Sequence, residues 1–113
     1  MATFTDVRRI ALALPETEEV TAWGDEVTFR VRGKIFVMEQ DRQAHASFKA
    51  TPEMQEELLE RDPGTFARAA YVGRFGWVDV DLARIDPAEL SRLIVRAWRL
   101  TAPKRLAATL AEG

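Results

Sequence analysis

Residues 26–38 show the alternation of a β-hairpin, and this feature constrains the fold more than any other. Hydrophobic residues stand at every second position from Val27 to Val31, with polar or charged residues between them. Such a repeat indicates a half-buried strand. Arg32-Gly33 then supplies a turn, and residues 34–38 form the returning strand. An antiparallel sheet is therefore expected at the centre of the fold.

Helical repeats precede and follow this hairpin. Apolar residues recur at helical spacing within residues 5–14, and Pro15 ends that helix. A second helix begins at Thr51-Pro52, because the hydroxyl can cap the helix and proline has no N–H to leave unpaired, and it extends to about residue 61. Asp86-Pro87 marks the start of the last long helix in the same way.

Two more strands complete the expected sheet. Residues 44–49 and 77–82 alternate as the hairpin does, whereas residues 16–25 have the composition of a polar loop and residues 65–75 that of a less regular piece. The expected order is α-β-β-β-α-β-α. We therefore predict an α+β fold with an antiparallel sheet and helices packed on one face, in a single domain over residues 1–113.

The composition excludes several kinds of protein. With 47% hydrophobic and 30% charged residues, the chain has the balance of a globular protein. It contains no cysteine, which excludes disulfides, thiolate metal sites and cysteine nucleophiles. The first residues lack the pattern of a signal peptide, and no stretch approaches the ~20 apolar residues that span a bilayer. We expect a soluble cytoplasmic protein with no membrane partner.

A row of cations along the hairpin is the first candidate site. Alternation places Arg30 and Arg32 on one face of their strand, and Lys34 lies just past the turn. The two later strands add Lys49 and Trp77 to that face. Cations beside an aromatic ring are typical of surfaces that bind nucleic acid by phosphate contact and base stacking. The alternative is the solvated face of a one-sided sheet.

The net charge of −2 and the pI near 5.5 limit nucleic-acid binding to a patch where cations are segregated. A second row of cations, Arg92, Arg96 and Arg99, lies on the polar side of the last helix. Glu89 precedes this row by three residues, as on an ordinary solvated helix. We interpret the row as such a helix face.

The segment from Tyr71 to Trp77 is the second candidate site. Gly73 and Gly76 allow its backbone to approach a ligand closely, and Arg74 lies between them. No phosphate-binding glycine motif occurs in the chain. The alternative is a loop whose aromatic rings close the core beside the last helix.

Enzyme chemistry finds little support in the sequence. One histidine and no cysteine argue against a metal site, and the serine-nucleophile signature is absent. His45 and Ser47 share one strand face, but no acid that would orient the imidazole is identifiable. The glutamates of the second helix have the pattern of a solvated face rather than of an iron site. We assign no catalytic residue, metal or cofactor.

The order of these segments resembles the MmcQ/YjbR family of small bacterial proteins. The resemblance covers nearly the whole chain and is carried by five short segments: Ala13-Leu14-Pro15 followed by Glu18-Glu19, then Trp23-Gly24, residues 29–36, Tyr71-Val72-Gly73-Arg74 and Gly76-Trp77-Val78. It implies a CyaY-like fold and a DNA-binding function, because that fold is similar to a double-wing DNA-binding motif. It also points to Arg74 as a ligand-binding residue.

Three functions follow as hypotheses, none of them enzymatic. The first is a binding module, with DNA as the candidate ligand, that uses six residues: Arg30, Arg32, Lys34, Lys49, Arg74 and Trp77. Secondary candidates are Trp23, His45 and Tyr71. The second is a protein-interaction or homodimer module, because the strand at residues 35–38 is apolar on both faces, with Ile35 and Val37 on one and Phe36 and Met38 on the other. The third is a small-molecule pocket between the Trp23 loop, the Arg74 loop and the sheet.

Overall fold

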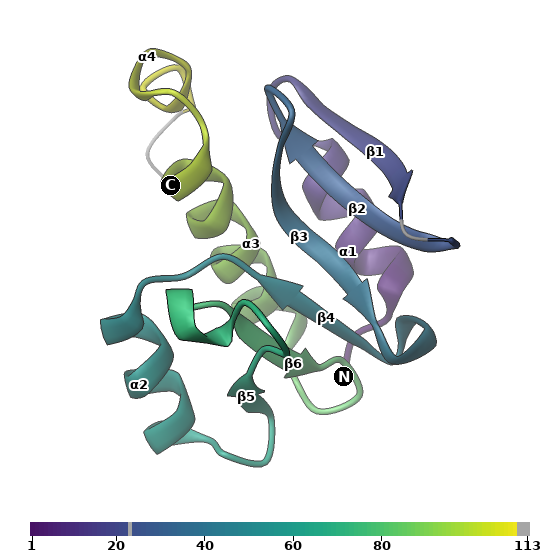
Figure 1. The fold of residues 1–113 in the computed structure, drawn as a ribbon, viewed down its shortest axis with the longest axis vertical. Coiled ribbons are helices and arrows are strands. Elements are labelled where there is room, and N and C mark those ends of the chain that lie inside the picture. Colours follow the sequence, from purple (N-terminus) through teal and green to yellow (C-terminus); the bar gives the residue numbers. More distant parts are fainter. Residues whose placement is uncertain (23, 111–113) are drawn as a thin grey trace.

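The computed structural model describes residues 1–22 and 24–110 and shows helices layered against one antiparallel sheet (Figure 1). The helices are α1 (Phe4–Leu12), α2 (Pro52–Arg61), α3 (Pro87–Thr101) and α4 (Lys104–Ala107). The strands are β1 (Thr17–Ala22), β2 (Glu26–Val31), β3 (Lys34–Gln40), β4 (His45–Phe48), β5 (Phe66–Arg68) and β6 (Val78–Asp81). Two short 3₁₀ turns are η1 (Asp41–Gln43) and η2 (Gly73–Phe75). The strand order across the sheet is β1-β2-β3-β4-β6-β5.

The helix starts follow the expected capping chemistry. Thr51 accepts a hydrogen bond from the amide of Met54, and Pro52 opens α2. The carboxylate of Asp86 accepts from the amides of Ala88 and Glu89 at the start of α3. Each cap satisfies amide groups that have no partner within the helix, and this sets where the helix begins.

The hydrophobic core lies between the sheet and the helices α1 and α3, which lie behind the sheet in Figure 1. Phe29 and Val37 from the hairpin and Val80 from β6 face this layer, and each has at most 1% of its surface exposed. Val7 from α1 and Trp98 from α3 are fully buried against them. α2 lies beside β5 at the far edge of the sheet and contributes Leu58 to the core.

A bulge in the hairpin decides which residues of β3 are buried. Phe29 pairs with Val37, but Arg30 pairs with Ile35, so Phe36 has no partner in the ladder. Ile35 and Met38 therefore share a face and are half-buried, whereas the neighbouring Phe36 and Val37 both enter the core. The expected division into a pair 35 and 37 and a pair 36 and 38 is wrong for this reason.

The α+β class, the antiparallel sheet and the main element order are confirmed. Residues 16–25 were expected to form a polar loop, but they contain the edge strand β1, which pairs along β2. The irregular piece 65–75 contains the short strand β5, which pairs with β6. None of the helices in the described residues is long and apolar enough to cross a membrane.

Candidate functional site

The sheet has one side that is turned away from α1 and α3, and we call this side the open face. Its residues alternate with those of the core and lie opposite one another in the strand register. They are Glu18, Val20 and Ala22 of β1, Glu26, Thr28 and Arg30 of β2, Ile35, Met38 and Gln40 of β3, His45 and Ser47 of β4, and Asp79 and Asp81 of β6. This is the face on which alternation predicted the first candidate site.

Residues 70–76, which we call the aromatic loop, connect β5 to β6 and reach across the open face. The side chain of Gln55 in α2 holds this loop, because its Nε2 donates to the carbonyl oxygens of Gly73 at 2.7 Å and Trp77 at 2.8 Å. Gly76 lies directly against the backbone of residues 50–52. Figure 1 shows the η2 turn of the loop between α2 and the strands β4 and β6.

Two aromatic side chains of this loop extend into solvent. Tyr71 is 96% exposed and Phe75 is 60% exposed. The guanidinium carbon of Arg74 lies 4.8 Å from the ring centroid of Phe75, which is a cation–π contact. Tyr71 also has a φ of 64°, a region that non-glycine residues rarely adopt. Exposed rings beside an arginine are suited to contact a flat or anionic ligand.

Two of the candidate cations, Arg30 and Lys49, lie at one end of the open face, and a third, Arg74, lies on the adjoining aromatic loop. Arg30 is half-buried there, and its Nε donates to the hydroxyl of Thr28 at 3.1 Å. Lys49 follows a core residue of β4, so alternation directs it to the open face, and its amide donates to the carbonyl of Phe36 on β3. Arg30 and Lys49 therefore flank β3, about 10 Å apart. The loop that contains Arg74 meets the end of β4 at Gly76, and Arg74 itself lines the groove between this loop and α2, where Glu56 and Glu60 also lie.

These three cations have no carboxylate partner within the residues that the structure describes. Other arginines of the chain do, as Arg8 with Glu19 and Arg61 with Glu89 show. Cations without a bound carboxylate remain available to an anionic ligand. We name Arg30 and Lys49 the cationic end of the open face, and Arg74 lies on the loop that adjoins it.

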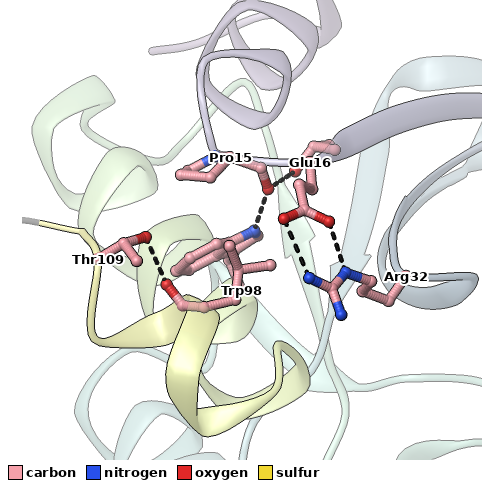
Figure 2. A network of polar contacts seen from close by, with 7 residues as sticks. Pro15, Glu16, Arg32, Trp98 and Thr109 are labelled. Carbon is pink, nitrogen blue, oxygen red and sulfur yellow. Dashed lines mark hydrogen bonds and ion pairs between the residues drawn. The ribbon is translucent and has the colours of Figure 1, made fainter.

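The structure does not bring the other candidates to that surface. β2 ends at Val31, and Arg32 lies in the turn with a φ of 51°, where its Nε donates to Glu16 at 2.5 Å (Figure 2). Its expected position beside Arg30 is therefore wrong. Lys34 pairs with the core residue Val31, so it belongs to the opposite side of the sheet. Trp77 is 9% exposed and offers no free ring, and Trp23 lies outside the described residues.

The other end of the open face is acidic and contains His45. The Nδ1 atom of His45 lies 2.6 Å from Oδ2 of Asp79, and the two side chains are 31% and 20% exposed. This hydrogen bond raises the pKa of His45 above its usual value, although burial opposes the shift, and the charges of Asp79, Asp81 and Asp41 add to it. The carboxylates of Asp79, Asp81 and Glu26 lie toward this end of the open face, whereas Glu18 lies opposite Arg30 at the other end.

We expect the His45–Asp79 pair to make stability depend on pH. Because the pKa of His45 is higher in the folded state, the pair stabilises the fold fully below the unfolded value of about 6.5, and this contribution is lost as pH rises through the folded value. Asp79→Asn should therefore cost about 1 kcal/mol of unfolding free energy near pH 5.5 and less near pH 9. Urea unfolding at both pH values measures this.

The matched control for this prediction is Asp79→Asn in a protein that lacks the His45 side chain. In a His45→Gln background, Asp79→Asn should have a cost that does not vary with pH. A cost that changes equally with pH in both backgrounds would assign the effect to another group.

His45 is not arranged for catalysis with Ser47. An orienting acid does exist, Asp79, and the sequence did not reveal it because β4 and β6 pair only in the folded sheet. The hydroxyl of Ser47, however, is buried and has no hydrogen-bond partner among the described residues. A nucleophile requires contact with its base and with substrate, and Ser47 has neither.

Two grooves flank the aromatic loop. One, of about 450 Å³, lies between α2 and the loop and contains Arg68 and Arg74 as well as Glu56 and Glu60. The other, of about 430 Å³, lies between the loop and the hairpin, beside Met38. Both volumes are within the range of small-ligand sites. Within the described residues, no group of three or more His, Asp or Glu side chains could hold a metal ion.

Sequence reasoning missed Phe75 and Arg68 as surface residues. The alternative interpretation of this loop placed all of its aromatic rings in the core, but Phe75 is exposed and only Trp77 is buried. The two rings are separated by one residue in a loop without periodicity, so no pattern distinguished them. Their roles depend on Gln55 and Gly76, which fix the path of the loop through contacts with distant segments.

Comparison with known proteins agrees with this architecture. A family model described as YjbR matches residues 12–100, so the chain belongs to the YjbR family. The chain is also similar to the solved structure of the Deinococcus radiodurans protein DR2400, which carries the domain DUF419. The two are 25% identical with a TM-score of 0.80, over 88% of this chain and 78% of that one. No curated protein matches the chain.

Proposed function

We propose that this chain is a non-enzymatic module that binds single-stranded DNA with the cationic end of the open face and the adjoining aromatic loop. The observation that supports it is that Arg30 and Lys49 on one face, and Arg74 on the adjoining loop, have no carboxylate at ion-pair distance within the described residues. A chain of net charge −2 needs such unpaired cations to contact phosphates. Exposed Phe75 and Tyr71 favour unpaired bases, on which aromatic rings can stack.

Fluorescence-anisotropy titration with labelled oligonucleotides of about 12 nucleotides tests the proposal. We expect a single strand to bind more tightly than the matching duplex. Three phosphate contacts predict a slope of log affinity against log salt of about −2 on single strands. Removing two cations with Lys49→Ala and Arg74→Ala should reduce that slope to about −0.7.

The control removes the same charge from another surface. Arg92 and Arg96 are exposed on α3, which covers the opposite face of the sheet. The double variant Arg92→Ala/Arg96→Ala should keep the slope of the unmodified protein. The proposal fails if this control loses binding to the same extent, or if no oligonucleotide binds at low salt.

A protein partner, including a second copy of the chain, is the other function that the surface supports. Tyr71 and Phe75 are exposed, and Ile35 and Met38 are half-buried on the open face, so apolar surface is available to a partner. Sedimentation equilibrium measures self-association. A monomer at all concentrations excludes the homodimer, whereas a dimer disrupted by Phe75→Ser supports it.

A further inference from the structure

The groove beside Met38 has a different chemical character from the cationic end. Its floor comes from Met38 of β3, and its wall comes from residues 70–72 of the aromatic loop, with Glu26 and Gln40 at the strand ends. Met38 is half-buried and flexible, a side chain that adapts to apolar ligands. We call this site the Met38 groove.

The charge at the Met38 groove is negative. Glu26 is the one charged side chain among the described residues that line it, and within the described chain no cation lies at ion-pair distance from its carboxylate. Gln40 pairs with His45, which pairs with Asp81 on the next strand, so the groove opens toward the acidic end of the open face. An anionic ligand would be repelled here and a cationic one attracted.

Tyr71 adds an aromatic surface to this groove. Its ring is almost fully exposed, although the residue has a left-handed backbone conformation that costs free energy for a side chain with a Cβ. The ring lies at a groove that also contains Val72 and Ala70. A ligand with an apolar body would cover Met38 and Val72, and a positive charge on it would contact both Glu26 and the face of Tyr71.

From these observations we infer that the Met38 groove binds a small organic ammonium ion with an apolar or aromatic body. The apolar part packs on Met38 and Val72, and the ammonium group donates to the carboxylate of Glu26 and the side-chain carbonyl of Gln40. This site shares Tyr71 with the proposed DNA surface, but its charged residue is Glu26 and none of its described lining residues is a cation.

Isothermal titration with 2-phenylethylamine, 2-phenylethanol and phenylacetate tests the inference on the full chain. The three probes share a phenyl ring and differ in charge. We expect the protonated amine to bind about fivefold more tightly than the neutral alcohol, and phenylacetate to show no saturable binding. Glu26→Gln should weaken the amine about fivefold and leave the alcohol unchanged. Amide chemical shifts should move at Met38, Gln40 and Val72.

The matched control is Glu18→Gln, which removes one carboxylate from the same face on the edge strand β1. It should leave the affinity for the amine unchanged. Tyr71→Gly should weaken both the amine and the alcohol without lowering the free energy of unfolding, since glycine accepts a positive φ. The inference is overturned if phenylacetate binds as well as the amine, if Glu18→Gln and Glu26→Gln act alike, or if no probe saturates. None of these results depends on whether DNA binds.

Discussion

The variant Gly76→Ala is expected to lower the free energy of unfolding by about 3 kcal/mol and to displace the aromatic loop. Gly76 has a φ of 101°, which an alanine adopts only at a cost of about 1 kcal/mol or more. A Cβ at this position would also lie 2.7 Å from the carbonyl oxygen of Ala50 and 2.7 Å from the carbonyl carbon of Thr51. Backbone atoms cannot rotate away, so the loop or the start of α2 must move, at roughly 1–3 kcal/mol more.

Gly33 provides a matched control for this prediction. It has a φ of 80°, yet a Cβ there would meet no atom within 4 Å. Gly33→Ala therefore measures the conformational cost alone, about 1 kcal/mol. Urea unfolding followed by circular dichroism compares the two variants. Equal losses of unfolding free energy in the two variants would show that Gly76 does not fix the loop against α2. Unchanged DNA affinity in Gly76→Ala would show that the position of the loop does not matter for the proposed DNA binding.

Periodicity and capping predicted the elements whose own residues determine them. The hairpin follows from the alternation around Val27 and Val31, and α2 and α3 follow from their Thr-Pro and Asp-Pro starts. β1 was missed because Glu18 and Glu19 give it a polar character. An edge strand needs only backbone pairing with its neighbour, and β1 obtains that from β2. Glu19 further pairs with Arg8 of α1, a contact that no local pattern reveals.

The candidate site could be predicted only where it follows from strand alternation. Arg30 lies on the open face as expected, and alternation from the core residue Phe48 directs Lys49 there too. The alternation failed for Arg32, because β2 ends one residue earlier and Glu16 holds the side chain in the turn. It failed again at the bulge beside Phe36. In both places the backbone leaves regular strand geometry, at the end of β2 and at the bulge, so the alternation of every second residue no longer applies.

The sequence could not predict which aromatic residues of the loop are buried and which are exposed. Tyr71, Phe75 and Trp77 have similar hydrophobic character, yet one is buried and two are exposed. What separates them is the position of the loop, which Gln55 holds from α2 by donating to two loop carbonyls. A contact between residues about twenty positions apart has no signature in a local pattern, and the aromatic surface depends on it.

Trp98→Ala should destabilise the fold even more than Gly76→Ala. Trp98 is fully buried in α3, and its Nε1 donates to the carbonyl of Pro15 at 3.1 Å (Figure 2). Trp98→Ala leaves a large cavity and removes that bond, so the free energy of unfolding should fall by about 4 kcal/mol. Trp98→Phe retains most of the apolar contact but leaves the Pro15 carbonyl without its main donor, which should cost about 2 kcal/mol.

Leu100→Ala is the control on the same helix, because that side chain is 40% exposed and should cost less than about 1 kcal/mol. Urea unfolding followed by circular dichroism avoids dependence on the fluorescence of the residue that is removed. If Trp98→Phe lowered the free energy of unfolding as much as Trp98→Ala, the destabilisation would come from the lost hydrogen bond to Pro15 rather than from lost packing. If neither variant differed from Leu100→Ala, α3 would not anchor the turn between α1 and β1. Since Glu16 of that turn also holds Arg32, the loss of Trp98 should loosen the β2–β3 turn as well.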